Sequence, residues 1–361
     1  MTSPLLAEPP RSVAVVKLSA IGDICHTLPV VRTLERAWPA ARFTWILGRA
    51  EAALIGAIPE IEFVVIDKRS GRRGLTALDR TLAGRRFDLL LHMQYAWRAS
   101  RIARRVRAPV KLGYDRERAL DLQWLFTTHR IEAGGREHAM DGLFGFARRL
   151  GVLDRHLRWD IPVPPSARER ALRLIPDDAP TLVVSPCSSH AVRNWRPERY
   201  AAVADHAART LGWRVLLCGG PSAIERETGA RIAAHMREPA VNLIGTDTLI
   251  ELHAVLERAA ALLTPDSGPA HMATAAGTPV IGLYASTSTG RSGPYFSREW
   301  CVDRFDEAAR RFLGRSAADL PWRTKIERAG VMDLIETDAV IERLEALAAS
   351  SSRGVPRAVA R

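Results

Sequence analysis

Short apolar, β-branched runs alternate with segments long enough for helices, and this alternation constrains the fold more than any other feature of the chain. In its first part a helix is predicted over Ile24–Ala37, and the expected strands are Val13–Leu18, Phe43–Leu47, Phe63–Ile66 and Phe87–Leu91. Strands separated by helix-length segments form parallel sheets through βαβ units. The pattern therefore predicts an α/β fold.

The alternation restarts after Arg155–Asp178, a stretch rich in proline, arginine and aspartate that indicates an interdomain linker. The later strands are expected at Leu182–Ser185, Val215–Cys218, Val241–Ile244, Ala261–Thr264 and Val280–Tyr284. The helices between them are expected at Pro197–Leu211, Ala223–Met236, Leu249–Ala259 and Pro269–Ala275. A chain of 361 residues is also long enough for two cores.

We therefore expect two Rossmann-like, doubly wound domains that face a central cleft, spanning residues 11–165 and 178–335. A last amphipathic helix, Asp338–Ala348 within residues 336–349, is expected to pack back towards the N-terminal domain. Residues 350–361 have no apolar pattern, and we expect them to form a flexible tail.

The positive charge of the chain is concentrated in its first half. The chain has 52 Lys/Arg and 40 Asp/Glu, a net charge of +12, and the segment from Ile66 to Arg118 carries 15 of the bases with five acids. For any single residue, a solvated helix face explains the charge equally well. The cluster as a whole favours an anionic partner, and with few aromatics and no nucleic-acid motif a phosphorylated lipid or sugar ranks above nucleic acid.

Several classes of protein are disfavoured. No apolar run approaches the roughly 20 residues of a membrane helix. The N-terminus lacks the pattern of a signal peptide, and four widely spaced cysteines suit a reducing cytoplasm better than disulfides or zinc. No G-x-G-x-x-G or Walker loop is present, and no cluster of carboxylates suggests a metal site.

The first segment with a chemical signature is the run from Lys17 to Pro29, which leaves a strand, turns at Gly22 and enters a helix. Asp23 then lies near the helix start at the edge of the sheet. Aspartate is a common N-cap, and taken alone this segment favours a capping role for Asp23.

Two later segments indicate binding of phosphate. Thr264–His271 follows a strand and opens a helix, where free N–H groups and the helix dipole suit a diphosphate, although an ordinary cap with a packed His271 is equally compatible. Ser185–Trp195 brings small hydroxyl residues and Arg193 to another strand end, which is a weaker signal when taken alone.

Taken together, S-x-x-G-D-x-x-H-T-x-P at Ser19–Pro29 and D-[ST]-G-x-x-H at Asp266–His271 resemble the bacterial ADP-heptose:lipopolysaccharide heptosyltransferases of glycosyltransferase family 9. The resemblance extends from Val13 to about Leu347. It implies a GT-B fold with a lipid acceptor held by the N-terminal domain and a nucleotide sugar held by the C-terminal domain. One departure is that Arg196 follows Trp195, where the family usually has a proline.

The resemblance also implies roles for individual residues. Asp23 would be the general base. The expected donor-binding residues are Ser188, Ser189, Arg193, Glu225 (or Glu227), Asp247, Asp266, Ser267, Gly268 and His271. The expected acceptor-binding residues are Ser19, Gly22, His26, Lys68, Arg69, Arg72, Arg116, Arg118 and His138, with Arg73, His129 and Arg130 as further candidates.

The function implied is inverting, metal-independent transfer of heptose from ADP-L-glycero-D-manno-heptose to the Kdo/heptose inner core of lipopolysaccharide, without a cofactor. The expected partners are this donor, Kdo-lipid A or an inner-core acceptor, and the anionic surface of the inner membrane, with no nucleic acid. We expect a cytoplasmic monomer, peripheral on the inner face of the cytoplasmic membrane. The alternatives are another donor sugar or acceptor on the same fold, an epimerase-like enzyme, and a binding module without chemistry, which would leave a buried Asp23 unexplained.

Overall fold

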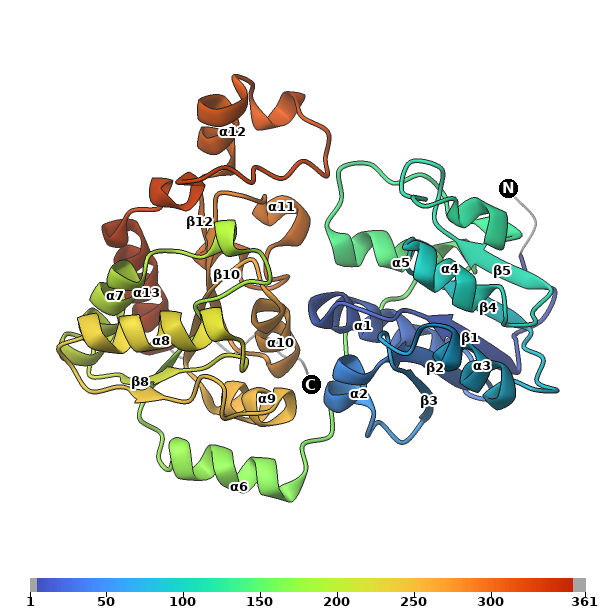
Figure 1. Ribbon diagram of the computed structural model, residues 1–361, viewed down its shortest axis with the longest axis horizontal. Coiled ribbons are helices and arrows are strands. Elements are labelled where there is room, and N and C mark those ends of the chain that lie inside the picture. Colours follow the sequence, from blue (N-terminus) through green and yellow to red (C-terminus); the bar gives the residue numbers. More distant parts are fainter. Residues whose placement is uncertain (1–4, 353–361) are drawn as a thin grey trace. The chain divides into compact units, whose positions relative to one another are not determined.

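The computed structural model describes residues 5–352, and the chain divides into two compact units between Pro162 and Val163. Each unit contains one parallel six-stranded sheet (Figure 1). The predicted α/β architecture with two doubly wound sheets is therefore present.

The first sheet has the strand order 3-2-1-4-5-6, the order of a Rossmann fold. Its strands are β3 (Ile61–Ile66), β2 (Arg42–Gly48), β1 (Ser12–Val16), β4 (Leu89–His92), β5 (Val110–Gly113) and β6 (His129–Arg130). The helices of this unit are α1 (Ile21–Ala37), α2 (Arg49–Ile55), α3 (Gly71–Thr81), α4 (Trp97–Ala103), the short 3-10 helix η1 (Gln123–Phe126) and α5 (Ala139–Arg149).

The second sheet repeats this order. Its first strand in the sequence, β7, lies between β8 and β10, which are its second and fourth strands. The strands run β12 (Val302–Asp303), β11 (Val280–Tyr284), β10 (Ala261–Pro265), β7 (Thr181–Val184), β8 (Arg214–Leu217) and β9 (Val241–Asn242). The main helices are α6 (Pro165–Leu174), α7 (Pro197–Arg209), α8 (Ala223–His235), α9 (Leu249–Arg258), α10 (Gly268–Ala276), α11 (Thr289–Ser292), α12 (Phe305–Leu313) and α13 (Thr337–Ser352). The short 3-10 helices are η2 (Ala191–Arg193), η3 (Arg298–Trp300), η4 (Ala317–Asp319) and η5 (Val331–Leu334).

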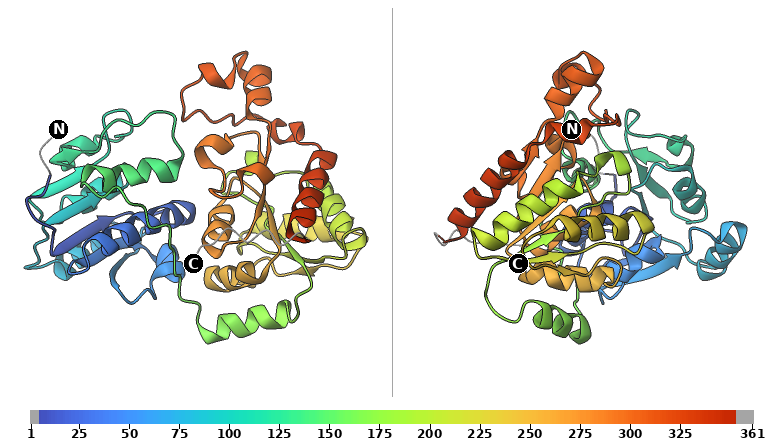
Figure 2. Two further views of the ribbon diagram at one scale, coloured as in Figure 1. Left: turned by 180° about the vertical axis from the view of Figure 1, so that it is seen from behind. Right: turned by 60° about the vertical axis from the view of Figure 1, so that its left-hand side comes forward.

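The central strands are apolar along their length because helices cover both faces of each sheet (Figure 2). In β1, Ala14 and Val16 pack with α3 and α4, while α1 packs against α5. Side chains alternate between the two faces of a strand, so Val13 and Val15 point to the opposite face from Ala14 and Val16, and all four are completely buried.

The expected linker contains a helix that was not predicted. Its residues 165–174 form α6, which belongs to the second unit, and Pro165 occupies the first turn, where it needs no N–H partner. Only the small side chains of Ala167 and Ala171 are buried in this helix. The apolar signal was therefore too weak to reveal α6.

The C-terminal helix packs into the core of the second unit, and its expected packing towards the N-terminal domain stays a prediction. Val340, Leu344 and Leu347 of α13 lie in the core of the second unit together with side chains of α7 and β11. The helix also continues to Ser352, into the expected tail, whereas residues 353–361 of that tail lie outside the described residues. Among the helices of residues 5–352, none has the length and apolar character needed to span a membrane.

Candidate functional site

Polar loops gather at the carboxyl edge of each sheet, at the point where the strand order reverses. In the first sheet this point lies between β1 and β4, and in the second between β7 and β10. Open α/β sheets bind their ligands at such switch points. The three motifs found in the sequence follow β1, β7 and β10, so all three lie at these two edges.

In the first unit, a buried lysine and a half-exposed aspartate form an ion pair beyond the end of β1. Lys17 Nζ lies 3.0 Å from Asp23 Oδ2, and the side chains are 5% and 49% exposed respectively. The expectation that Asp23 is buried was therefore wrong: the residue lies in the first turn of α1 and projects from the sheet edge. It is not the N-cap either, because α1 begins at Ile21, before Gly22, and Ala20 holds the cap position.

The charge on Lys17 is maintained by this pairing. Burial alone lowers the pKa of Lys17, but the nearby carboxylate of Asp23 and its hydrogen bond outweigh the burial, so the pKa is raised above its usual value. The ammonium thus fixes the position of one carboxylate oxygen and leaves the other side of the carboxylate open to a ligand. Lys17 is part of the first motif but was not among the predicted site residues.

Gln94, just after β4, holds the loop that carries Ser19. Its Oε1 accepts a hydrogen bond from the Leu18 N–H at 2.6 Å, and its Nε2 donates to Ser19 Oγ at 3.4 Å. The predicted residue Ser19 is thereby held in the loop between β1 and α1, while Gly22 is buried inside α1. Nothing in the sequence motifs pointed to Gln94, which lies 76 positions beyond Leu18.

The two predicted histidines of the first unit meet each other. The rings of His26 and His138 contact edge to face, with centroids 5.2 Å apart, and both side chains are buried. His138 is the N-cap of α5, where its Nδ1 accepts the N–H of Met140. His138 therefore has a structural role in this unit, and its contact with an acceptor stays a prediction.

The predicted basic residues fall into two groups. Lys68 binds both carboxylate oxygens of Glu51 at 2.7 Å, and Arg118 is paired with Asp115 and Glu137. These two cations are therefore largely neutralised by their neighbours. The others present their side chains to solvent more freely: Arg69, Arg72, Arg73 and Arg116 are exposed, and His129 and Arg130 are half-buried.

In the second unit, Arg193 connects two carboxylates at the carboxyl edge of the sheet. Its guanidinium lies 3.5 Å from Asp266 and 3.1 Å from Glu327, and its side chain is only 8% exposed. Asp266 also accepts a hydrogen bond from Ser292 at 3.3 Å. The structure thus brings together Arg193 and Asp266, which the sequence placed in separate motifs.

Helix α10 begins at this edge with its first N–H groups directed out of the sheet. Ser267 is the N-cap, and its hydroxyl contacts Thr264 Oγ1 at 2.8 Å instead of capping the helix. Gly268 and Pro269 form the first turn, and His271 is buried in the next. Since no side chain caps these N–H groups, the helix start can serve an anion.

The unusual Arg196 does not disturb this site. Its guanidinium forms a fork with both carboxylate oxygens of Asp333, at 2.5 and 2.6 Å, away from Arg193. Trp195 remains fully buried and donates from its indole to the carbonyl of Ile335 at 3.0 Å. The late proline, Pro197, simply starts α7.

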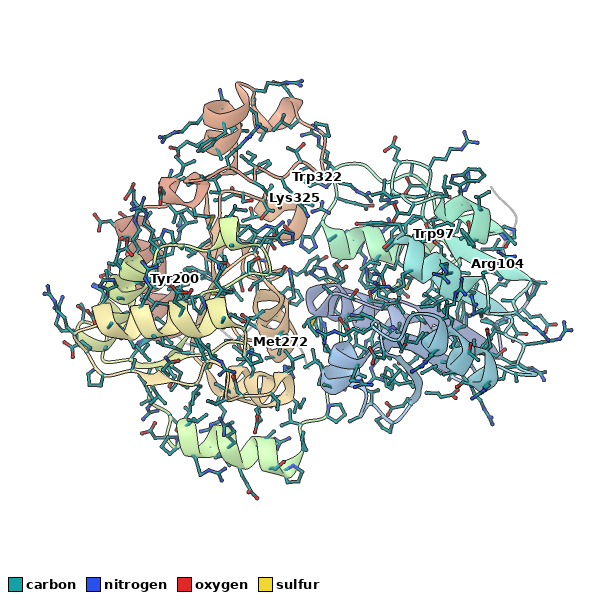
Figure 3. The ribbon with its side chains drawn as sticks, viewed as in Figure 1. Trp97, Arg104, Tyr200, Met272, Trp322 and Lys325 are labelled. Atoms are coloured by element: carbon teal, nitrogen blue, oxygen red, sulfur yellow. The ribbon has the colours of Figure 1, made fainter. Side chains whose placement is uncertain are left out.

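Two further charged residues reach this edge from outside the motifs. Glu327 pairs with Arg193, and Lys325 lies near enough to Arg193 and Arg291 for their charges to act on it. Burial, with these two guanidiniums, lowers the pKa of Lys325. Figure 3 labels Lys325 together with Trp322 from the same segment. No motif marks this segment, so sequence reasoning missed it.

The remaining predicted donor residues flank the same sheet edge. Ser188 donates its N–H to Asn194, and Ser189 is exposed. Both oxygens of Glu225 are used in capping α8, through the Gly220 N–H and the Ser222 hydroxyl, whereas Glu227 is exposed.

Asp247 has the most perturbed carboxylate of this group. Burial raises its pKa to about 6, against the opposing effects of a backbone hydrogen bond and Arg170. Its Oδ1 is buried without a hydrogen-bond partner among the described residues. Such an oxygen is available to a ligand donor. Within residues 5–352, no group of three or more His, Cys, Asp or Glu side chains is arranged to hold a metal ion.

Comparison with known proteins gives this arrangement a family. Residues 75–316 match the pattern of glycosyltransferase family 9 (heptosyltransferase). The chain is 36% identical to the lipopolysaccharide core heptosyltransferase OpsX of Haemophilus influenzae, with 95% of this chain and 99% of the relative covered. The chain belongs to glycosyltransferase family 9. It is therefore a glycosyltransferase, as the motifs predicted.

Solved structures confirm the fold of this family 9 glycosyltransferase. A family 9 glycosyltransferase from Veillonella parvula superimposes with a TM-score of 0.77 at 22% identity, covering 94% of this chain and 97% of the other. The heptosyltransferase WaaC of Escherichia coli, solved with ADP, gives a TM-score of 0.72 at 20% identity, covering 93% and 99%. The predicted GT-B architecture is thus confirmed.

Proposed function

We propose that this enzyme transfers heptose from ADP-L-glycero-D-manno-heptose to the Kdo/heptose inner core of lipopolysaccharide. The observation that carries the proposal is the Lys17–Asp23 pair at the switch point of the first sheet, where Asp23 is the aspartate of the S-x-x-G-D motif. The similarity to OpsX over nearly the whole length of both chains supports the choice of heptose and lipopolysaccharide.

In the proposed reaction, Asp23 acts as general base on an acceptor hydroxyl. The hydroxyl oxygen attacks the anomeric carbon, its proton passes to the open oxygen of Asp23, and the C–O bond to the diphosphate breaks. The bonding electrons leave with ADP. Because the hydroxyl attacks the face opposite the departing ADP in a single displacement, the configuration at the anomeric carbon is inverted. Base catalysis of this kind contributes roughly 10²–10⁴ in rate.

The second unit would hold the donor. The α10 start and the Arg193 guanidinium can stabilise the negative charge that develops on the departing diphosphate. Asp247, whose Oδ1 is buried without a hydrogen-bond partner among the described residues, and the exposed Glu227 would accept hydrogen bonds from the nucleoside. Glu225 could take this role only by giving up its contacts with Gly220 and Ser222. We propose that this electrostatic stabilisation suffices without a metal ion.

The first unit would hold the acceptor, through Ser19 and the exposed arginines Arg69, Arg72 and Arg116. The phosphates and carboxylates of Kdo-lipid A or of the inner core are anionic, which suits these side chains. We propose that the enzyme is a monomer that works at the inner face of the cytoplasmic membrane, where such an acceptor is anchored.

The decisive experiment is incubation of the pure protein with ADP-heptose or with UDP-sugars, with Kdo-lipid A as acceptor and a chelator present. Transfer from ADP-heptose supports the proposal. Transfer only from UDP-sugars would reject the donor, and loss of activity with the chelator would reject metal independence. Turnover of the nucleotide sugar without acceptor would instead favour an epimerase.

We expect Asp23→Ala and Asp23→Asn to lower transfer by roughly 10²–10⁴ because both remove the base. ADP affinity, measured by calorimetry, should remain nearly unchanged because the proposed donor contacts lie in the second unit. The Asn variant retains a hydrogen-bond acceptor for the buried Lys17 and controls for misfolding. Wild-type turnover in either variant, or loss of ADP binding in the Asn variant, would refute the assignment.

A further inference from the structure

A set of large apolar side chains is exposed on the first unit. Within the described residues, eleven large apolar side chains are more than a third exposed, and five of them fall between positions 97 and 125. They are exposed by 47% to 58%, and we call them the tryptophan patch: Trp97, Leu120, Leu122, Trp124 and Leu125. Exposed apolar side chains are common singly, but a cluster marks a binding surface.

The fold holds this patch in place. Asp121 accepts the backbone N–H of Trp97 at 3.0 Å, which ties the 120–125 segment to the start of α4. The indole of Trp97 meets the ring of Phe126 edge to face at 5.6 Å. Gln123 is completely buried and donates to the carbonyl of His92 at 2.8 Å, while both residues beside it stay exposed.

The backbone is also bent to present this segment. Asp121 and Leu122 have φ values of 50° and 56°, in the left-handed region that non-glycine residues avoid. A leucine in this conformation is energetically unfavourable, and burial of its side chain does not compensate, because Leu122 is 52% exposed. Segments held in such conformations are concentrated at functional sites.

Cationic side chains border the patch. An open groove of about 640 Å³ runs between α3, α4 and η1, and it is lined by Asp79, Trp97, Arg101, Arg104, Arg105 and Phe126. Arg105 is paired with Asp79 at 2.9 Å. Arg98, Arg101 and Arg104 are exposed and form no ion pair with any residue of the described chain. Figure 3 labels Trp97 and Arg104, which both belong to this part of the first unit.

We propose that the tryptophan patch and Arg98, Arg101 and Arg104 together dock this enzyme on an anionic lipid bilayer. Tryptophan side chains are favoured at the level of the lipid headgroups, and leucines can enter the acyl region beside them. Unpaired arginines attract anionic lipid phosphates near such a surface. The combination of apolar and cationic side chains matches the chemistry of this surface.

The charges argue against a second copy of the chain as the occupant. A two-fold contact through this face would put the same arginines of both copies close together, and like charges in an interface are unfavourable. Nucleic acid would leave the three exposed leucines in contact with water or phosphate. An anionic bilayer accommodates both kinds of side chain.

The patch lies on the same sheet edge as the catalytic candidates. Trp97 begins α4 only three residues after Gln94, which holds the Ser19 loop. Docking through this surface would therefore keep the edge that carries Asp23 close to a lipid-anchored acceptor. This inference names the surface behind the proposed membrane location. It rests on the proposed function only for the reason why the enzyme docks, which is to reach a lipid-anchored acceptor.

The test is flotation of the full-length protein with vesicles of phosphatidylcholine alone or with added phosphatidylglycerol, without donor. Two patch variants, W124S/L125S and R101E/R104E, are compared with two matched controls, L153S/L172S and R173E/R231E. The control residues are equally exposed but lie outside the patch. Circular dichroism confirms that each variant is folded.

We expect the wild type and both controls to bind vesicles that contain phosphatidylglycerol, and to release them as salt is raised. Each patch variant should bind at least tenfold more weakly. Failure of the wild type to bind these vesicles would overturn the proposal. Binding of both patch variants as tight as that of the wild type would overturn it too. The proposal would also be overturned if light scattering showed the wild type to be a dimer and W124S/L125S to be a monomer.

Transfer to a deacylated, water-soluble inner-core acceptor separates this inference from the proposed function. The patch variants should retain wild-type turnover with the soluble acceptor and show a raised KM for the vesicle-bound acceptor. Vesicle binding without transfer to either acceptor would reject the proposed function and leave the docking surface intact. Transfer to the soluble acceptor without vesicle binding would reject the docking surface and leave the proposed function intact.

Discussion

Lys17 and Asp23 depend on each other unequally. Lys17 is nearly fully buried, and its ammonium is compensated mainly by the Asp23 carboxylate 3.0 Å away. A buried charge that loses its partner is strongly destabilising, whereas the half-exposed carboxylate is still solvated without the lysine. Because the pKa of Lys17 is raised, the pair stabilises the fold below the ordinary lysine pKa and loses this effect only in strong alkali.

We expect Lys17→Met to reduce kcat by about 10- to 100-fold, since the carboxylate loses the group that positions it. Lys17 acts through Asp23, so the same substitution in an Asp23→Ala background should cause no further loss. Steady-state kinetics of the two single variants and the double variant measure this. Additive losses would show that Lys17 has a role independent of Asp23, and Lys17→Arg should recover part of the activity.

A second titrating group belongs to the donor half. The pKa of Asp247 is raised to about 6 by burial, so the folded protein holds this proton more tightly than the unfolded chain does. Asp247 therefore leaves stability unaffected below the ordinary aspartate pKa. As pH rises from about 4 to 6, it lowers the free energy of unfolding.

We expect Asp247→Asn to have little effect on stability at pH 4 and to stabilise the protein at pH 7, by about 1–3 kcal/mol. Urea unfolding at both pH values measures the difference. Asp178→Asn, at an exposed position, serves as the control. A difference between variant and wild type that does not change with pH would contradict the raised pKa.

The site residues that could be predicted lie in short motifs that follow the end of a strand. Asp23, Arg193 and Asp266 were predicted because each belongs to a segment that follows an expected β-strand, and because the motifs together resemble those of family 9. Lys325 and Glu327 follow no strand, and Glu327 meets Arg193 across 134 positions of sequence. Such pairing depends on the tertiary fold, which local patterns do not encode.

At the scale of elements, strands with a buried apolar run were predictable, whereas three of the short strands were not. The strands β1, β2 and β4 lie within two residues of their expected positions, because their apolar runs are buried on both sides. The sequence analysis missed β5, β6 and β12, which are short and partly exposed. An amphipathic pattern likewise predicted α13 but could not say which surface it covers.

Leu344 tests the observed position of α13. The side chain is completely buried in the second core, so Leu344→Ala should lower the free energy of unfolding by about 2–5 kcal/mol. Leu172→Ala, at a residue 43% exposed, should change it by less than about 0.5 kcal/mol. Equal effects of the two substitutions in urea unfolding would contradict the packing.

At the scale of the whole molecule, the two units differ in charge although they share a topology. Residues 1–162 contain 27 Lys/Arg and 17 Asp/Glu, and residues 163–361 contain 25 and 23. Nearly all of the net charge of +12 thus belongs to the first unit. This asymmetry supports the proposal that the first unit serves an anionic acceptor and an anionic membrane surface.

Separate cores predict separate responses to ligand. ADP bound only by the second unit should stabilise that unit by about 2.7 kcal/mol at a concentration one hundred times its Kd. Scanning calorimetry should then show two transitions. ADP should raise the Tm of only one of them, the one whose Tm Leu344→Ala lowers. A shift of the other transition, or of both equally, would place the nucleotide outside the second unit.

The second core closes only with the last part of the chain. Trp195 donates to the carbonyl of Ile335, Arg196 forks onto Asp333, and Val340, Leu344 and Leu347 complete the apolar interior. During synthesis the first unit has all of its residues once Pro162 has left the ribosome, but the second must wait until Leu347 has emerged as well. A stop codon before position 331 would therefore leave the first unit able to fold and the Arg193 segment without its support.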